Sequence, residues 1–516
     1  MEERVLRFPR HAGDDASFLR HQEWLVTNGL GGYASGTLEG TATRRYHGVF
    51  IPNLQAPRGR TVILPRLDEE IHLSSPSKKI LLNGVEFTDG KCEGDAASYL
   101  TEFRLDWQIP VWTFEFDGRV FEKKIVMPHG QNTTVISYRL VSGDALRLTL
   151  QPFLTFRAVD DAFGHPPDWP FALVVMDGRY EIHPFDGAPS LKMSLRSLPG
   201  DFTVHQKISE NILYSVERAR GQGFSESLSS PGYFSAEMKA GDSVGLVLST
   251  EAWEVLEINP EDIFRQEKER LQKLLTLVPL HAQTGLAAQL TLAADQFIIL
   301  PWNRVEENMS HRVSEEKLRT VIAGYHWFTD WGRDTMISLE GLTLCTGRYG
   351  EAEAILKTFS HYVKDGLLPN LFPEGQRTAL YHTVDATFWF FHAIDRYYET
   401  TGNEEILHFL YPALQSIIEH HLKGTHFGIQ EDPRDGLIRA GAEGYQLTWM
   451  DAKVEDWVVT PRRGKPVEIQ ALWYNALKLM EHWSKKLNRP AQLYADLSQK
   501  AQNTFNRRFC CEEGKY

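Results

Sequence analysis

Cysteine is scarce in this sequence, and the usual nucleophile and metal motifs are missing. The 516 residues contain four cysteines, which are Cys92, Cys345, Cys510 and Cys511. Their spacing is not that of a metal site, and so few thiols do not form a disulfide framework. The sequence also has no HExxH motif, no GxSxG motif and no Cys/His cluster. We therefore predict reduced structural thiols and no bound metal.

Signals for export and for membrane insertion are also absent. The first residues, MEERVLRFPRHAGDD, carry charges where a signal peptide has its apolar core. No uninterrupted apolar run approaches the roughly 18 residues that a membrane span needs. These absences predict a cytoplasmic protein with no membrane partner.

The sequence has fewer basic residues than acidic residues. The chain has 55 Lys and Arg against 68 Asp and Glu, a net charge of −13. This argues against nucleic acid or an anionic membrane as the main partner. It does not oppose a neutral polyhydroxyl substrate, because such a substrate needs no electrostatic steering. The length predicts two or three domains.

The sequence pattern changes near residue 258. Before that point, short β-rich runs such as 146–154 (LRLTLQPFL) are separated by Pro, Gly and Asp, which is typical of a sandwich or barrel. We predict an N-terminal β-sandwich domain at residues 1–258. Residues 260–278 then place apolar side chains near one helical face, so we predict a linker helix at 259–282.

The remainder, residues 283–516, is predicted to be helical with polar connections. The expected helices are 286–301, 335–347, 350–365, 383–400, 403–423, 468–486 and 490–508. No short repeat with a recognisable signature is present. A closed helical barrel is therefore favoured over a solenoid.

A glycine-rich stretch lies near the N-terminus. Residues 24–48 read WLVTNGLGGYASGTLEGTATRRYHG and include six glycines. Neither GxGxxG nor GxxxxGK[ST] is present, so a phosphate loop is a poor interpretation. Two interpretations remain open: a structural hairpin that needs glycine for its backbone, or a wall of a substrate site.

Residues 325–336 (YHWFTDWGRDTM) gather aromatic and charged side chains before a predicted helix. Arg333 and Asp334 are a donor and an acceptor for two adjacent sugar hydroxyls. Trp331 and Trp327 could form an apolar platform for the sugar ring. The alternative is an aspartate N-cap beside a core aromatic cluster.

Residues 445–457 (YQLTWMDAKVEDW) form a second candidate stretch, in a glycine-bearing loop. Glycoside hydrolysis normally uses two carboxyl groups, one of which protonates the leaving oxygen. Asp451 follows Trp449 and Met450 in the sequence. Apolar surroundings disfavour the charged form of a carboxyl group and raise its pKa, so that it can serve as a general acid near neutral pH. Trp449 is a candidate substrate-binding residue. The alternative is a solvated loop aspartate.

Two more carboxylates stand near predicted helix starts. Asp385 opens the aromatic run VDATFWFFHAI, and Glu468 lies in PVEIQALWYNAL. Both are candidate sugar ligands. A helix cap explains Asp385 equally well. The helix dipole favours a carboxylate at the position of Glu468, whether or not it binds sugar. A buried inner helix would account for the aromatic residues that follow Asp385.

Together these motifs resemble the glycogen debranching enzymes. The resemblance rests on TNGLGGYASGT, TRRYHG, WFTDWGRDTM, LLPNLFPEG, VDATFWFFHAI, TWMDAK and PVEIQALWYNAL in this order. It is to the amylo-α-1,6-glucosidase part in its short bacterial and archaeal form, and it extends from about residue 20 to 510.

The resemblance implies an N-terminal β-super-sandwich and a C-terminal (α/α)6 toroid. It implies an inverting glucosidase without metal or organic cofactor, acting on glycogen or an α-glucan oligosaccharide. By the match to TWMD, Asp451 would be the general acid. By the match to WGRD, Arg333 and Asp334 would bind the terminal glucose, with Trp331 beside them.

The resemblance is incomplete at the C-terminal end. A toroid of this kind needs twelve helices, whereas the sequence predicts seven before it ends at FCCEEGKY. The family's general base is a glutamate far downstream of TWMD, so we expect it beyond Tyr516 and assign none here. The chain as written is therefore expected to be an incomplete toroid that could be inactive.

Three functions remain open at this point. The first is hydrolysis of α-1,6-linked glucose stubs on debranched glycogen. The second keeps the fold but acts on another α-glucoside, such as an α-1,4-glucan or trehalose. The third is a non-catalytic glucan-binding protein. Nothing resembles a separate glucanotransferase domain, because the N-terminal half lacks alternating strands and helices.

Overall fold

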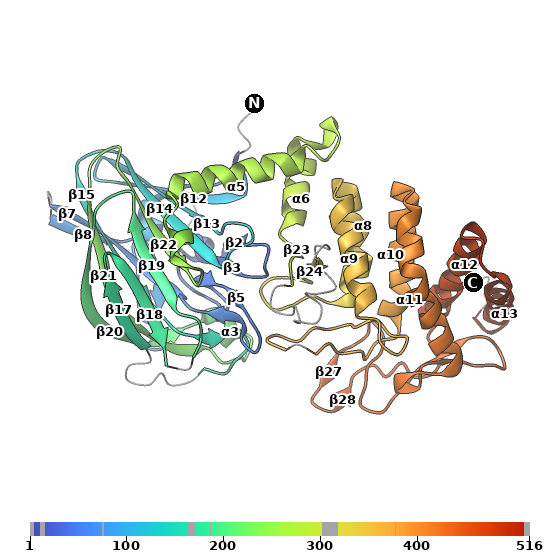
Figure 1. Cartoon of the computed structure of the whole chain (residues 1–516). Coiled ribbons are helices and arrows are strands. Elements are labelled where there is room, and N and C mark those ends of the chain that lie inside the picture. Colours follow the sequence, from blue (N-terminus) through green and yellow to red (C-terminus); the bar gives the residue numbers. More distant parts are fainter. Residues whose placement is uncertain are drawn as a thin grey trace. The chain divides into compact units, whose positions relative to one another are not determined.

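The computed structural model describes the chain at residues 5–10, 16–74, 77–163, 171–185, 187–301, 318–376 and 378–509. The chain divides into two compact units, a β-rich first unit and a helical second unit (Figure 1). The first contains the residues up to Thr276 and Ala288–Gln296, and the second contains Leu277–Ala287, Phe297–Pro301 and the described residues from 318 onward. Each unit is described by itself below.

Two antiparallel sheets form the frame of the first unit. Within the described residues, the larger sheet has nine strands, in the order β1 (Val5–Pro9), β11 (Leu100–Asp106), β12 (Ile109–Phe116), β13 (Arg119–Val126), β14 (Thr133–Ser142), β22 (Ser243–Ser249), β19 (Leu191–Arg196), β18 (Arg179–Pro184) and β17 (Phe171–Met176). The smaller has five, in the order β20 (Asp201–Leu213), β21 (Ser225–Met238), β15 (Leu146–Phe153), β7 (Arg66–Ser74) and β8 (Ser77–Leu81). The expected strand at 146–154 is thus β15.

The two sheets share one hydrophobic core, which makes them a sandwich. Ile136 and Tyr138 of β14 belong to this core together with Leu148 of β15 and Phe234 of β21. Val135, the neighbour of Ile136, belongs instead to a cluster on the other face of the sheet. Successive side chains of a strand point to opposite faces, so β14 is buried on both sides.

The predicted linker helix packs on that second face. It is α5 (Pro260–Leu275), whose Ile263 and Phe264 belong to the same buried cluster as Val135. The Asn259 side chain accepts a 3.0 Å hydrogen bond from the Glu261 backbone N–H, an N-cap that begins the helix at Pro260. The segment is therefore part of the first unit rather than a free connector.

Smaller elements complete the first unit. They are β2 (Glu23–Thr27), β3 (Tyr33–Thr37), β4 (Gly48–Ile51), β5 (Asn53–Leu54), β6 (Gly59–Val62), β9 (Val85–Glu86), β10 (Cys92–Glu93), β16 (Arg157–Ala158), α1 (Ala16–His21), α2 (Ala96–Tyr99), α3 (Ser215–Ala219) and α4 (Trp253–Leu256). The strands among them form small sheets in the orders β2-β3-β4, β16-β6-β5 and β10-β9.

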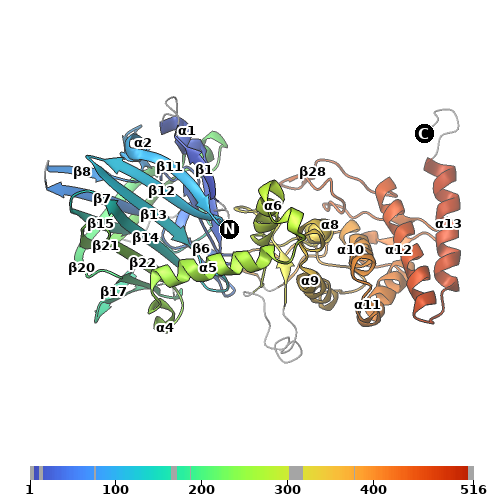
Figure 2. The ribbon, with the colours of Figure 1, turned by 90° about the horizontal axis from the view of Figure 1, so that it is seen from above.

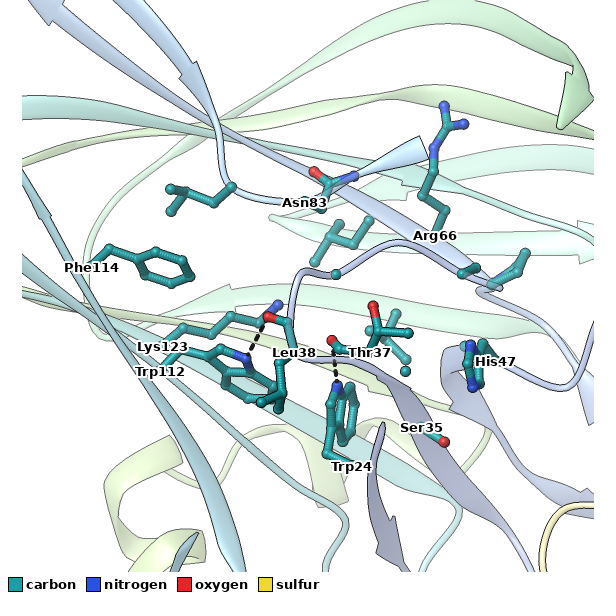
Figure 3. Close-up of a pocket in the computed structure, with 18 residues that line it drawn as sticks. Trp24, Ser35, Thr37, Leu38, His47, Arg66, Asn83, Trp112, Phe114 and Lys123 are labelled. Atoms are coloured by element: carbon teal, nitrogen blue, oxygen red, sulfur yellow. Dashed lines mark hydrogen bonds between the residues drawn. The ribbon is translucent and has the colours of Figure 1, made fainter. Parts of the chain in front are cut away.

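The glycine-rich stretch is built into the first unit. Figure 3 shows a cavity lined in part by its residues, where the indole N–H groups of Trp24 and Trp112 donate to the backbone carbonyls of Thr37 and Leu38, each at 3.2 Å. A Cβ atom at Gly36 would lie 3.3 Å from the Trp24 indole nitrogen. Glycine at this position therefore allows close packing, as the structural interpretation expects.

The second unit is helical. Its helices are α8 (Gly332–Leu342), α9 (Tyr349–His361), α10 (Asp385–Thr401), α11 (Glu404–Lys423), α12 (Val467–Lys486) and α13 (Gln492–Phe509). They are preceded by α6 (Gly285–Asp295), whose residues are divided between the two units. Short strand pairs complete the unit: β23 (Ile298–Ile299) with β24 (Thr320–Val321), β25 (Gln430–Glu431) with β26 (Ile438–Arg439), and β27 (Lys453–Val454) with β28 (Trp457–Val458).

Helix packing places α10 at the centre of the described helical unit. It contacts α8 on one side and α12 on the other, and α9 and α11 pack against α10 and against each other. Figure 2, seen from above, shows α8, α10 and α12 in one row and α9 and α11 in another. Phe388, Phe390 and Phe391 of α10 are fully buried. These three phenylalanines are therefore core residues, and among the described helices no closed ring is formed.

The sequence predicted the helices well, with one clear error. The expected helix 286–301 ends at Asp295, because Ile298 and Ile299 leave the helix and pair with Val321 and Thr320 in a short antiparallel ladder. β-Branched residues favour such extended structure.

Among the described residues, no helix is long and apolar enough to cross a membrane. Of the cysteines, Cys92 and Cys345 are free and exposed, so they are surface thiols rather than the structural thiols expected. Cys510 and Cys511 lie outside the described residues.

A buried histidine links the stability of the helical unit to pH. His421 of α11 packs against the rings of Phe388 and Trp473, with centroid distances of 4.8 and 6.0 Å. Its Nδ1 atom lies 2.8 Å from the Ile417 carbonyl oxygen, so this nitrogen carries the proton and donates. Burial lowers the pKa of His421 to about 4, since the apolar surroundings disfavour the imidazolium form.

We predict that this histidine destabilises the fold in mild acid. The unfolded chain takes up the proton near pH 6.5, whereas the folded chain resists it down to about pH 4, so the free energy of unfolding falls as the pH is lowered between these values. The contribution of His421 should approach about 3 kcal/mol at the acid end. Urea unfolding at several pH values should show a flatter dependence for His421→Gln, whereas His408→Gln, an exposed site on the same helix, should match the wild type. An unchanged slope in His421→Gln would contradict this account.

Candidate active site

The candidate residues gather at the starts of neighbouring helices. Arg333 and Asp334 are the second and third residues of α8, Asp385 is the first residue of α10, and Glu468 is the second residue of α12. Because α10 contacts both α8 and α12, residues far apart in the sequence come into one region. The partial positive charge at a helix start also favours carboxylates there.

Arg333 connects two of the candidate carboxylates. Its Nε donates to both oxygens of Asp385 at 3.0 and 2.9 Å, and its Nη1 donates to Asp451 Oδ2 at 3.3 Å. The side chains of Arg333 and Asp385 are 9% and 2% exposed, whereas that of Asp451 is 42% exposed. Arg333 is therefore held in place by the buried Asp385, and Asp451 keeps a face open to solvent.

Thr383 orients this ion pair. Its hydroxyl donates to Asp385 Oδ1 at 2.8 Å and lies 3.5 Å from Arg333 Nη2. Asp385 thus accepts hydrogen bonds from both neighbours, whereas the backbone N–H of Ala386 at the helix start donates to the Thr383 hydroxyl at 3.4 Å. The structure therefore shows an ion pair rather than a helix cap at Asp385.

A close backbone contact sets the start of α8. Gly332 N–H donates to the Asn370 carbonyl at 3.0 Å, and Arg333 N–H donates to the Asn370 side-chain oxygen at 3.2 Å. A Cβ atom at Gly332 would lie 2.0 Å from the Pro369 carbonyl oxygen. The WGRD glycine is therefore required for this approach, and the asparagine of LLPNLFPEG provides the two acceptors that fix the direction of α8.

The loop that carries Asp451 is anchored just before α10. The Val384 N–H donates to the Leu447 carbonyl at 2.8 Å, and Leu447 and Thr448 are buried. Beyond this anchor the chain is more open: Trp449 is 58% exposed and Met450 is also exposed. The apolar packing expected around Asp451 is therefore not formed in the described chain.

Asp334 lies close to the same charges. Burial raises the pKa of Asp334, Arg333 opposes that change, and the carboxylates of Asp451 and Asp385 add to it. The side chain still has solvent contact. The N-cap position of α8 belongs to Trp331, so Asp334 is a residue of the first turn rather than a cap.

The aromatic residues before α8 are only partly open. Trp331 and Trp327 are half-buried, whereas Phe328 is exposed. Trp331 packs its ring edge to face with Phe328, with centroids 6.1 Å apart. Trp327 makes a similar contact with His326 at 5.8 Å. These contacts hold the aromatic cluster in one arrangement, with Phe328 as its most accessible ring.

Glu468 joins a different partner. Both of its carboxylate oxygens accept hydrogen bonds from Arg462, and the Arg462 Nη2–Oε2 distance is 2.7 Å. Among the described residues, Glu468 thus belongs to a pair with Arg462 and not to the cluster around Arg333. Its role as a sugar ligand stays a prediction.

Sequence reasoning missed three residues at this site. Thr383 and Asn370 position Arg333, as described above, and His382 lies close enough to Arg333 and Asp451 to be affected by both charges. Burial and the Arg333 charge lower the pKa of His382, and Asp451 opposes them. All three lie within or next to motifs used for the resemblance, but polar residues of loops carry no spacing signal that would identify them.

The described residues contain no group of three or more His, Cys, Asp or Glu side chains that could hold a metal ion. The cluster instead combines one guanidinium with several carboxylates, a set that can bind sugar hydroxyls in pairs and supply an acid.

Two family models match the chain. One, described as glycogen debranching enzyme N terminal, matches residues 22–245, and the other, described as amylo-alpha-1,6-glucosidase, matches residues 292–516. The chain belongs to the glycogen debranching enzyme family. Every candidate site residue lies within the amylo-alpha-1,6-glucosidase match, and the two matches confirm the family resemblance.

A curated relative supports the family. The chain is 30% identical to the glycogen debranching enzyme of Saccharomyces cerevisiae over a segment that covers 29% of this chain and 13% of the yeast protein. The chain thus aligns with a small part of the length of that debranching enzyme.

Solved structures show a related fold. A bacterial glucoamylase complexed with acarbose has a TM-score of 0.51 and 12% identity, over 98% of this chain and 70% of that chain. This likeness shows a glucoamylase-like fold for the debranching family chain. A GH78 family rhamnosidase of Bacillus sp. GL1 has a TM-score of 0.29 and 12% identity, over 76% of this chain and 33% of that chain, a likeness too low to support a common fold.

We predict that Gly332→Ala will destabilise the helical unit. The added Cβ would meet the Pro369 carbonyl at 2.0 Å, so α8 must move, at a cost of about 1–3 kcal/mol. Gly341 lies in the same helix, and a Cβ atom there would have nothing within 4 Å. Gly341→Ala should therefore be neutral or stabilising by up to about 1 kcal/mol. Urea unfolding of both variants tests this, and equal stabilities would rule out the steric explanation.

We predict a larger loss for Asp385→Asn. The change keeps the shape of the side chain but leaves the buried Arg333 without its main counter-charge, at a cost of about 3–5 kcal/mol. Asp365→Asn is the control, because Asp365 pairs with His426 at the surface, where solvent screens the pair and its loss should change stability little. Thermal unfolding of the two variants would contradict the buried-pair account if Asp385→Asn lost no more stability than Asp365→Asn.

Proposed function

We propose that this chain carries the glucosidase site of a debranching enzyme, which removes α-1,6-linked glucose stubs from debranched glycogen or a similar glucan. The observation that carries the proposal is the Asp451 carboxylate, half exposed and 3.3 Å from the anchored Arg333. The family assignment and the glucoamylase-like fold support it. In this proposal Asp451 is the general acid and the protein is cytoplasmic.

The terminal glucose would bind beside Asp451. Arg333 is anchored through Nε by Asp385 and directs Nη1 toward Asp451, while Asp334 offers a solvent-accessible acceptor one residue along α8. This donor and acceptor pair suits two adjacent hydroxyls of one sugar. Apolar surface for the sugar ring would come from Trp331, Trp327 and Trp449. Glu468 would supply a more distant polar contact.

The proposed reaction inverts the anomeric carbon. Asp451 gives its proton to the glycosidic oxygen as the bond from that oxygen to C1 breaks, and the glucan leaves with the new hydroxyl. Water attacks C1 from the opposite face and gives its proton to a second carboxylate, which yields β-glucose. In inverting glycosidases the two carboxyl groups lie about 6.5–9.5 Å apart, leaving room for this water. The proposal assigns the acid and no base.

We propose that 283–516 belongs to an (α/α)6 toroid in which α8, α10 and α12 are inner helices, preceded by a β-sandwich domain at 1–258 and the segment 259–282. The row formed by these three helices supports this, because their starts carry Arg333, Asp385 and Glu468.

Asp451→Asn tests the catalytic assignment. Loss of a general acid should reduce turnover by about two to four orders of magnitude, measured as glucose released from phosphorylase-limit dextrin after α-1,4-transferase treatment. Asp496→Asn, on the exposed side of α13, should behave like the wild type. NMR should detect β-glucose first. Near-normal turnover in Asp451→Asn would remove Asp451 from this role.

The same assay separates the rival substrates. Glucose release from isomaltosyl, maltosyl and trehalose substrates is compared with release from the treated dextrin. Preference for the α-1,6 linkage supports the debranching function. A folded protein that releases glucose faster from maltosyl or trehalose substrates would overturn it, as would binding of oligosaccharides without any release.

A further inference from the structure

A β-hairpin follows directly after Asp451. Its strands β27 and β28 pair Lys453 with Val458 and Val454 with Trp457, and the Val459 N–H extends the ladder by donating to the Ala452 carbonyl at 3.1 Å. The hairpin is labelled in Figure 1 in the helical unit. Because this last bond involves the residue after Asp451, the base of the hairpin is the loop that carries the carboxylate.

The two faces of the hairpin differ sharply. Val458 is buried, so its face packs on the protein, whereas Val454 and Trp457 are 58% and 64% exposed. These two residues are directly opposite each other in the ladder, so their side chains lie on one face. Trp449, on the other side of Asp451 in the sequence, is also mostly exposed. A folded protein seldom leaves an indole ring this open, and such clusters commonly mark binding surfaces.

The position of this face relative to Asp451 limits what can bind there. Val454 is three residues beyond Asp451, which is a path of roughly 10 Å in extended chain. Arg333 belongs to a different segment, the start of α8, and its guanidinium reaches the same carboxylate. The Asp451 carboxylate thus has the Arg333 guanidinium as one neighbour and the apolar face of the hairpin as the other.

We infer that the exposed face of this hairpin, formed by Val454 and Trp457, binds the glucan chain from which the terminal glucose is removed. The inference rests on the proposed function. A general acid must contact the oxygen that joins the two sugars, so when Arg333 and Asp334 hold the departing glucose, the remaining α-1,4-linked chain continues past Asp451. Trp457 would then determine preference for long glucans over short glucosides.

The chemistry of the hairpin fits a sugar chain. An indole ring presents a flat apolar face, and the exposed Glu455 and Asp456 of the hairpin turn offer acceptors for hydroxyl groups. The face is a hairpin of two residue pairs, whereas a stable protein interface needs roughly 800 Å² on each partner. A narrow aromatic strip with polar edges therefore favours a single extended oligosaccharide over a protein partner.

Binding without turnover provides the test. Maltoheptaose is titrated into the wild type and into Trp457→Ala, and binding is measured by calorimetry. We expect the Kd for maltoheptaose to rise by about tenfold or more in Trp457→Ala. Trp457→Phe, which keeps an aromatic ring, should restore most of the affinity. Tyr349→Ala, an exposed aromatic at the start of α9, is the matched control and should change the Kd by less than about threefold.

Kinetics separate this inference from the proposed function. Trp457→Ala should lower kcat/KM for long branched dextrin and leave kcat/KM for isomaltose within about twofold of the wild type. Equal losses on both substrates, or an unchanged Kd for maltoheptaose, would overturn the role of the hairpin while leaving the glucosidase assignment intact. A wild-type protein that binds maltoheptaose through Trp457 but releases no glucose would overturn the glucosidase assignment instead.

Discussion

The buried ion pair between Arg333 and Asp385 is the interaction on which the rest of the candidate site depends. It joins the first turn of α8 to the first residue of α10 through two hydrogen bonds. A guanidinium this deeply buried needs its counter-charge, because an unpaired buried charge is costly. The pair therefore fixes both the direction of the Arg333 side chain and the relative position of two helix starts. Asp451 therefore accepts a hydrogen bond from an Arg333 side chain that Asp385 already holds in place.

Around this pair, the backbone rather than the side chains sets the geometry. Gly332 allows α8 to begin against the Pro369 carbonyl, and Asn370 accepts hydrogen bonds from the first two residues of the helix. Val384 anchors the Asp451 loop through the Leu447 carbonyl. A rigid frame thus carries a carboxylate that stays half exposed. Such a division suits a site that must hold a substrate in place while its acid remains accessible.

Much of the fold could be predicted from the sequence. The predicted change from strands to helices and the predicted ranges of most helices were correct. Hydrophobic residues that recur with a period of two or about 3.6 residues show which face of a strand or helix is buried. The helix expected at 286–301 was too long, since pairing of Ile298 with Val321 is a contact between distant residues. The helix at 260–278 was recognised, but its packing on the nine-stranded sheet was not, for the same reason. A buried inner helix was expected to account for the aromatic residues of α10, and Phe388, Phe390 and Phe391 are indeed buried.

For the site, the sequence by itself determined which chemical groups are available: the carboxylates, the arginine and the indole rings stand in motifs that point to one family. Tertiary structure decided how they are used. It paired Asp385 with Arg333, paired Glu468 with Arg462, left Asp451 half open and exposed Trp457. The physical reason is that a side chain's role depends on its neighbours and its burial. Both are set by helix packing and loop anchoring between segments far apart in the chain, which local sequence patterns do not encode.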